Sequence, residues 1–372
     1  MPVPPIFLSR LTERGMMIGF PESRAPSPEP RTMQISASDR SALLGIIERF
    51  PRQHIVLVGD LVADEFILGE IARVSREAPV LILKQRSKQI LPGGGANAAS
   101  NLADLGARVT PVGVVGDDEA GEALLGCFRD KGVSTRQVVR LRGHVTPTKS
   151  RVLGVLSHGR PQQIVRVDRE PPQKLDRRTR RRLTEAARAC LDAADAVLIS
   201  DYGYGATDSA EVGRLRRRPR GIDRRRLPVT VDSRYDVLSY TGVTAATPNE
   251  PEIEAAFGQP IGDNLELLDR LGMKMLRRQS LQALVITRGR EGMVVFEPRQ
   301  KPLRLPVFGS DQVADVTGAG DTVVAAFTLA LAAGASFVHA AMLANCAGGL
   351  VVMKSGTATV TRRELEEALR NA

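Results

Sequence analysis

The chain lacks several features that would place it in a specialised class of protein. It has no tryptophan, 4% aromatic residues and only three cysteines among 372 residues. The cysteines are scattered without metal-ligand spacing and their odd number argues against a disulfide framework, so we expect a reducing, cytoplasmic setting. No apolar run reaches the roughly 18 residues that span a bilayer, so we expect no membrane partner. What remains, 42% hydrophobic and 25% charged residues, is ordinary for a globular protein.

Positive charge is the main compositional excess. The net charge is +10, and much of it lies in two arginine-rich runs, 177–182 and 214–226. Such runs can bind a polyanion or can form a solvated surface. Neither run contains the aromatic residues that stack on bases, so we favour the solvated surface and expect no nucleic-acid partner. We expect the first run to start a surface helix and the second to form a loop.

The N-terminal part of the chain is expected to lie outside the fold. Residues 1–31 contain several prolines and lack the continuous apolar core of a secretory signal. We therefore predict a disordered extension over 1–37 and a folded domain over 38–372.

Strand and helix patterns alternate through the rest of the chain. The expected strands are 54–58, 109–115, 196–201, 229–232, 243–247 and 283–287, with a hairpin at 292–296 and 303–307. The expected helices are 41–50, 96–105, 119–131, 250–257, 265–278, 320–333 and 337–351, with a last helix opened by a capping box at 361–364. This alternation predicts an α/β fold with βαβ units and a parallel sheet. Strand-like segments at 65–84 and 148–168 are expected to lie outside the central layer.

Polar residues fall at or just after the ends of the expected central strands. Because ligands bind at the carboxyl ends of strands in such sheets, we expect one composite site rather than scattered surface residues. The residues are Asp60, Asp201, Asp232, Asn249 and Thr287.

The most informative stretch is the run 315–322, which places Gly318, Ala319, Gly320 and Asp321 at the start of a long apolar helix. The free amides of a first helical turn can hold an anion, and small residues let a phosphate approach the main chain. Asp321 lies beside this cradle as a candidate base, which suits phosphoryl transfer to an alcohol. The alternative is a plain helix start with an Asp in its first turn.

Three weaker patterns accompany this run. Residues 92–97 combine a glycine-rich turn with a helix start, where Gly93, Gly94 and Asn97 could meet a ligand hydroxyl. Asp60 and Asp64 could bind sugar hydroxyls, or could be loop carboxylates that face water. Asn249 and Glu252 share a helix face and could organise hydrated magnesium, or could be a simple cap.

Together these segments resemble the PfkB or ribokinase-like family of carbohydrate kinases, from about residue 52 to the end. Residues 93–121 are similar to the family's first signature, and residues 315–322 match its second. Residues 249–252 fit its magnesium and phosphate motif, and residues 287–292 its nucleotide segment. The resemblance implies a three-layer sandwich with a mostly parallel sheet and a small β lid, formed by 65–84 and 148–168.

Within the family, the chain is most similar to kinases of D-glycero-β-D-manno-heptose 7-phosphate, the first module of bifunctional ADP-heptose synthases. Segments that carry this similarity include 71–80, 162–168, 200–205 and 354–360. Arg234 and Tyr235 depart from it, because the subgroup usually continues Asp-Pro-Lys there, and this leaves the sugar open. Another sugar or sugar phosphate is the alternative substrate, and a non-catalytic sugar- or nucleotide-binding regulator is the alternative of another class.

The resemblance implies a role for each candidate residue. Asp321 would be the base, and the amides of residues 318–320 would stabilise the transferred phosphoryl group. The sugar would be bound by Asp60, Asp64, Gly93, Gly94 and Asn97, and its distal phosphate by Lys84, Arg151 and Arg166. ATP would be bound by Asn249, Glu250, Pro251, Glu252, Thr287, Gly289 and Asn345.

The implied small molecules and assembly follow from the same resemblance. ATP and Mg²⁺ are the expected cofactors, with the metal held by Glu252 through water, and a monovalent cation is an optional addition. The lid would exclude water or act as a dimer clasp, and a homodimer is expected.

Overall fold

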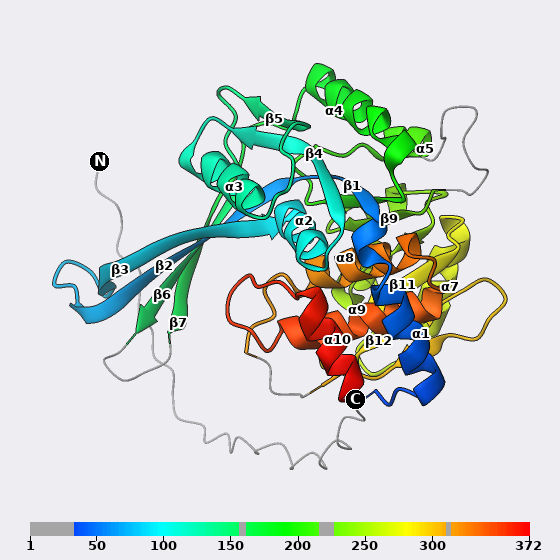
Figure 1. Cartoon of the computed structure of the whole chain (residues 1–372). Coiled ribbons are helices and arrows are strands. Elements are labelled where there is room, and N and C mark those ends of the chain that lie inside the picture. Colours follow the sequence, from blue (N-terminus) through cyan, green and yellow to red (C-terminus); the bar gives the residue numbers. More distant parts are fainter. Residues whose placement is uncertain (1–32, 156–160, 216–226, 310–313) are drawn as a thin grey trace, which may run out of the picture.

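Short apolar runs form the strands of a central sheet in the computed structural model, which describes residues 33–155, 161–215, 227–309 and 314–372 (Figure 1). The strand order is β13-β12-β11-β10-β9-β8-β1-β4-β5. All neighbours from β11 to β5 are parallel, whereas β12 is antiparallel to both β11 and β13. The strands are β1 (His54–Gly59), β4 (Arg108–Gly116), β5 (Val138–Leu141), β8 (Ala196–Asp201), β9 (Val229–Ser233), β10 (Ala245–Ala246), β11 (Ala283–Thr287), β12 (Met293–Phe296) and β13 (Leu303–Leu305).

Helices cover both faces of this sheet, because successive strand residues point to opposite sides. In β1, Ile55 and Leu57 pack into one apolar cluster, while Val56 and Val58 pack into the other. The first cluster contains residues of α1 (Ala37–Ile47), α2 (Gly95–Asp104), α3 (Glu119–Asp130), α8 (Ala319–Ala332), α9 (Phe337–Val351) and α10 (Arg362–Arg370). The second contains residues of α4 (Arg177–Ala189), α5 (Ser209–Leu215), α6 (Glu250–Phe257) and α7 (Leu265–Arg278). The expected three-layer α/β sandwich is confirmed.

A second sheet of four strands projects from the side of this body as a long ribbon (Figure 1). Its order is β3-β2-β6-β7, formed by β2 (Leu61–Val74), β3 (Leu81–Gly94), β6 (Thr148–Val155) and β7 (Gln162–Arg169). We call this sheet the lid. Its strands cover the segments expected outside the central layer, but β2 and β3 are longer than expected because both continue into the core.

The glycine-rich turn expected at residues 92–95 is wrong. Pro92, Gly93 and Gly94 complete β3, and Gly95 already begins α2. Gly94 makes the corner alone, with a φ of 51°, a conformation that glycine adopts without steric cost. The lid strand and the helix that carries Asn97 are therefore joined directly.

The ends of the described chain differ in detail from the expected boundaries. Met33 donates its amide to the Val307 carbonyl at 2.9 Å, and Met33 and Ile35 are buried, so the fold begins before residue 38. The extension expected over 1–37 otherwise lies outside the described residues. The arginines from 177 onward begin α4 as expected, with Asp176 as its N-cap, whereas residues 216–226 are outside the described part. No helix among the described residues is long and apolar enough to cross a membrane.

Candidate active site

The strand register brings the polar strand-end residues to one edge of the sheet. Gly59 pairs with Ser200, and Ser200 pairs with Asp232, so the ends of β1, β8 and β9 lie side by side. Asn249 and Thr287 form an isolated parallel bridge further along the same edge. These residues lie along one edge of the sheet because the strands that precede them are parallel neighbours, as a composite site would require.

The glycine-led start of α8 lies against α2. The helix begins at Ala319, and its N-cap residue Gly318 has a φ of 77° and provides no side-chain cap. A Cβ at residue 318 would lie 2.4 Å from Nδ2 of Asn97, so only glycine fits this contact. The amide of Ala319 already donates to the Val316 carbonyl at 3.2 Å, so the expected anion contact at this residue is not favoured. The amide of Gly320 has no partner within the helix and can bind an anion.

Asp321 lies in this first turn and is 3% exposed. Tyr202 donates its hydroxyl to Oδ1 of Asp321 at 2.8 Å, and Asn97 donates Nδ2 to Oδ2 at 3.0 Å. Burial raises the pKa of Asp321 to about 7, although these two hydrogen bonds act in the opposite direction. A carboxyl group with such a pKa can exchange a proton near neutral pH, which is what a general base requires.

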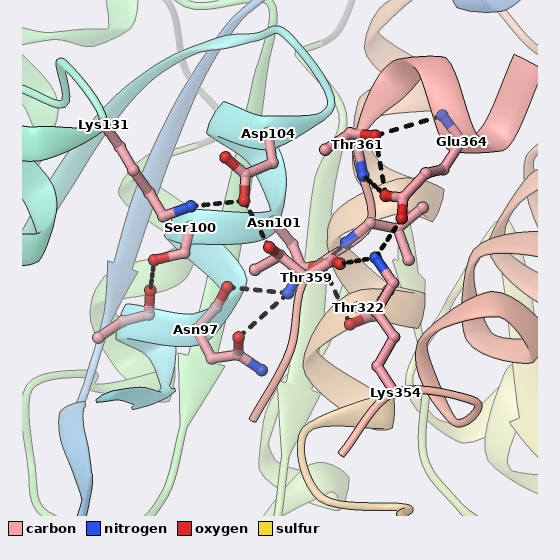
Figure 2. A network of polar contacts seen from close by, with 12 residues as sticks. Asn97, Ser100, Asn101, Asp104, Lys131, Thr322, Lys354, Thr359, Thr361 and Glu364 are labelled. Atoms are coloured by element: carbon pink, nitrogen blue, oxygen red, sulfur yellow. Dashed lines mark hydrogen bonds and ion pairs between the residues drawn. The ribbon is translucent and has the colours of Figure 1, made fainter. Parts of the chain in front are cut away.

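A chain of side-chain hydrogen bonds fixes α2 against α8 and the C-terminal segment (Figure 2). Asn101 donates Nδ2 to Oδ1 of Asn97 at 3.2 Å, and its own Oδ1 accepts the Thr322 hydroxyl at 3.1 Å. The same Oδ1 accepts the amide of Val360 at 3.3 Å. Because Thr322 directly follows Asp321, this network aligns the carboxylate with Asn97.

Asp64 is a buried lid residue rather than a loop carboxylate facing water. It lies in β2 and is 4% exposed. Arg151 donates to Oδ1 of Asp64 at 2.6 Å, and Thr357 donates its hydroxyl to Oδ2 at 2.8 Å. A Cβ on Gly93 would approach Oδ2 of Asp64 to 2.7 Å, so the glycine leaves room for this carboxylate. The structure thus gathers Asp64, Gly93 and Arg151 beside Asp321.

Asp60 lies close by, but its carboxylate is turned into the protein. It accepts the amides of Tyr202 at 2.8 Å, Tyr204 at 3.0 Å and Ala206 at 2.9 Å. Burial raises the pKa of Asp60 to about 6. Asp60 therefore holds the loop after β8, and the expected contact with a sugar hydroxyl is not favoured by this geometry.

The three cations proposed for a distal phosphate lie at different distances along the lid. Arg151 is next to Asp64, and Arg166 lies directly opposite Arg151 in β7, where it forms an ion pair with Asp168 at 2.8 Å. Lys84 pairs with Glu70, six residues along β2 from Asp64, which is about 20 Å at the usual rise of a strand. The structure does not bring Lys84 to the site.

Lys149 is a cation that the sequence analysis missed. It lies opposite Asp64 in the register of β2 and β6, and its Nζ is 5.0 Å from the ring centroid of Tyr202. Burial lowers its pKa, while the Asp64 carboxylate acts against this shift. Strand alternation from Arg151 would have placed Lys149 on the same face.

A cavity of about 180 Å³ opens on the other side of the start of α8. Two of the residues expected at the nucleotide, Thr287 and Gly289, line it together with Ala319 and Gly320. Asn345 also lines it and donates Nδ2 to the Pro306 carbonyl at 2.6 Å. The remaining walls are largely apolar, with Met293, Val307, Val316, Val323 and Val352. Such a pocket suits a flat heterocycle such as a nucleobase.

The segment 249–252 caps α6, as expected. Asn249 accepts the amide of Glu252 at 2.8 Å, and Glu252 accepts the amide of Asn249 at 2.9 Å. Glu250 instead forms an ion pair with Arg288 at 2.5 Å, and Pro251 occupies the first turn. Of the four, Glu252 is the carboxylate whose charge reaches the site.

Glu252 and Asp232 are carboxylates near the start of α8, and their negative charges favour a nearby cation. Burial raises the pKa of Glu252 and of Asp232, and the negative charges of Glu252 and Asp321 add to the effect on Asp232. Among the described residues, no group of three or more metal-ligating side chains is close enough to enclose an ion. This donor set fits Mg²⁺, which keeps several waters and needs few protein ligands when phosphates supply the rest.

Comparison with known proteins decides the family. A model described as pfkB family carbohydrate kinase matches residues 52–363. The chain belongs to this family. A pfkB carbohydrate kinase is an enzyme that transfers a phosphoryl group, and the family implies ATP and typically Mg²⁺.

Curated relatives of this pfkB kinase carry the description "Bifunctional protein HldE". The protein from Geobacter sulfurreducens is 40% identical over 318 residues, which is 84% of this chain and 62% of that protein. The protein from Pelobacter propionicus is 38% identical over 334 residues, 89% of this chain and 66% of that protein. The protein from Desulfatibacillum aliphaticivorans is 36% identical and is matched over 65% of its length. The chain thus spans roughly two thirds or less of these relatives.

Solved structures show the same ribokinase-like fold. A ribokinase from Arabidopsis thaliana, complexed with ribose and ATP, has a TM-score of 0.65 at 21% identity and covers 86% of this chain and 98% of its own. The phosphofructokinase-2 of Escherichia coli, in complex with substrates and products, has a TM-score of 0.68 at 18% identity and covers 86% and 99%. The expected ribokinase-like architecture is confirmed.

Proposed function

We propose that this pfkB kinase phosphorylates the anomeric hydroxyl of D-glycero-β-D-manno-heptose 7-phosphate and yields the 1,7-bisphosphate. The observation that carries the proposal is the pair of cations, Lys149 and Arg151, on the lid face beside Asp64. A sugar that already bears a phosphate needs such a second cationic pocket, whereas a free sugar does not. The similarity to proteins described as HldE also supports it.

In the proposed reaction, the oxygen of the anomeric hydroxyl bonds to the γ-phosphorus of ATP, and Asp321 accepts the proton of that hydroxyl. The bond between that phosphorus and the bridging oxygen breaks, and ADP leaves with the bond electrons. The amides of Gly318 and Gly320 would stabilise the charge on the transferred group. Mg²⁺, held near Glu252 through water, would neutralise the phosphate oxygens when bound.

Asp64, Gly93 and Arg151 would bind the acceptor sugar, with Lys149 and Arg151 reaching its phosphate. The cavity lined by Thr287, Gly289 and Asn345 would hold the nucleobase, and the γ-phosphate would then reach the start of α8. The lid strands would cover the sugar and exclude water.

A homodimer joined through the lid is part of this proposal. Val74, Val165 and Val167 on the lid are 58%, 47% and 57% exposed. Exposed apolar side chains of this kind are typical of a surface that packs against a partner. Sedimentation of the full chain measures the assembly, and a concentration-independent monomer would contradict it.

The function is tested by measuring ATP consumption with a panel of acceptors. Heptose 7-phosphate should give the highest kcat/KM, ahead of fructose 6-phosphate and ribose. Asp321→Asn should keep the fold and lower kcat by about three orders of magnitude or more, since it removes the base. A better acceptor elsewhere in the panel would replace the substrate, and no consumption with any acceptor would favour a binding protein. Near-normal turnover of Asp321→Asn would remove Asp321 from the role of base.

A further inference from the structure

The loop that follows β8 is held by buried carboxylates. Asp60 accepts three of its amides, and Asp201 accepts a fourth, from Gly203, at 3.0 Å. Gly203 and Gly205 have φ values of 82° and 96°, which let the loop turn its amides toward Asp60. A loop fixed by a charged group in this way keeps a single conformation, at the cost of burying that charge.

The side chain that this loop presents is Tyr202, which touches three parts of the site. A Cβ on Gly94 would lie 3.1 Å from its ring, so the ring packs on the corner between β3 and α2. Lys149 of the lid lies over the ring, at 5.0 Å from its centroid. The hydroxyl donates to Oδ1 of Asp321 at 2.8 Å.

Tyr202 and Asn97 both donate to Asp321, and they leave it able to act as a base. A carboxylate has about four lone-pair positions, so the bonds from Tyr202 and Asn97 leave others open to a substrate proton. A phenol in this position donates to the charged carboxylate and favours ionisation. It also fixes the torsion of the carboxylate, because both oxygens are held at once.

We propose that Tyr202 is a positioning residue that holds the Asp321 carboxylate ionised and oriented for proton transfer, and that Asp60 acts through the loop to place it. This inference rests on the proposed role of Asp321 as the base. The proposed anion site lies at the glycine-led start of α8, whereas this contact comes from a different part of the chain, the segment after β8.

Other charges face Asp321 and Tyr202 and must be considered with them. Asp64 on β2 raises the pKa of Asp321, and Lys149 on β6 lowers it. Asp232 and Arg234, at and after β9, act on the pKa of Tyr202 in opposite directions, Asp232 raising it and Arg234 lowering it. All four remain in a variant that removes only the phenolic oxygen, so a change in that variant reports the hydrogen bond.

The experiment compares Tyr202→Phe with Tyr204→Phe in the full chain. Tyr204 lies on the same loop and donates its hydroxyl to Glu170 at 2.8 Å on the exposed surface, so it is a matched control. Loss of a hydrogen bond to a charged group should move the acid limb of kcat/KM in Tyr202→Phe upward by about one pH unit. Activity should then fall about fivefold near pH 7 and recover near pH 9. Tyr204→Phe should keep the profile of the unmodified enzyme.

A second readout does not depend on the sugar. The infrared band of the Asp321 carboxylate, isolated as the difference between the unmodified chain and Asp321→Asn, should titrate at higher pH in Tyr202→Phe. An unchanged titration, an activity loss that is equal at all pH values, or the same loss in Tyr204→Phe would overturn the inference. If Asp321→Asn retained turnover, the base role would fail, and the infrared titration would still decide whether Tyr202 controls this carboxylate.

Discussion

Acid should inactivate this kinase well above the pH at which an ordinary aspartate protonates. Asp321 must be ionised to accept a proton, and burial raises its pKa to about 7. A carboxylate with a raised pKa is protonated as pH falls through that value, so activity is lost on the acid side and retained above it. An exposed aspartate would lose its charge only near pH 4.

The size of the effect follows from this pKa. The ionised fraction of a group that titrates near 7 is about 9% at pH 6 and about 91% at pH 8, so kcat/KM should rise about tenfold between them. Because kcat/KM reports the free enzyme, the negative charges of bound substrates do not enter the comparison. ATP consumption at low acceptor concentration measures it directly.

A fold control and a refuting result make this test sharp. Circular dichroism across the same range is the control, because burial raises the pKa of Asp60 to about 6 and its protonation would weaken its hold on the loop after β8. A constant spectrum shows that the fold is retained. A kcat/KM that is flat between pH 6 and pH 8, with an intact fold, would show that Asp321 is not the titrating base. An acid limb near pH 4 would show instead that its charge is better solvated than its burial indicates.

Two further predictions concern the lid and the start of α8. Arg151→Ala should raise the KM for the sugar phosphate about thirtyfold, because it removes a charge-assisted contact beside the buried Asp64. Lys84→Ala should change this KM less than about twofold. Equal effects of the two variants in steady-state kinetics would contradict the assignment of the phosphate pocket. Gly318→Ala should lower the free energy of unfolding by about 1–2 kcal/mol, because residue 318 has a left-handed φ of 77°. Gly320→Ala should not lower it, because a Cβ at residue 320 would meet no other atom. Urea unfolding measures both, and a Gly318→Ala variant as stable as the unmodified chain would show that the contact with Asn97 relaxes freely.

Most of the fold could be predicted from the sequence, because the central strands and their helices are short, strongly apolar and regularly punctuated. The expected helices 265–278 and 337–351 match α7 and α9 to the residue. The missed elements, β5 and α5, are short and have weak apolar periodicity. The turn expected at 92–95 failed because glycine was interpreted as a break, although a strand can pass through it and end at a single positive φ.

Candidate site residues can be identified from the sequence where one local segment carries the chemistry, as at Asp321 and Asn249. The sequence does not reveal a residue's role where that role depends on tertiary contacts. Asp60 follows its strand as a substrate ligand would, but three backbone amides from a loop over 140 positions away occupy it. Lys84 has the right charge but lies too far along the ribbon, a distance that only the register of β2 and β3 reveals.

The continuity of β2 and β3 has a mechanical consequence. Their pairing is regular from Leu61 to Leu68, and the irregularities lie further out, between Leu68 and Gly69 and between Ile71 and Arg73. The inner eight of the fourteen residues of β2, which include Asp64, thus form a stiff segment, while the outer part can flex at the bulges. A tilt of about 10° at Asp64 would displace the outer end of β2, ten residues or about 33 Å away, by about 6 Å, so large movements of the ribbon correspond to small adjustments at the acceptor.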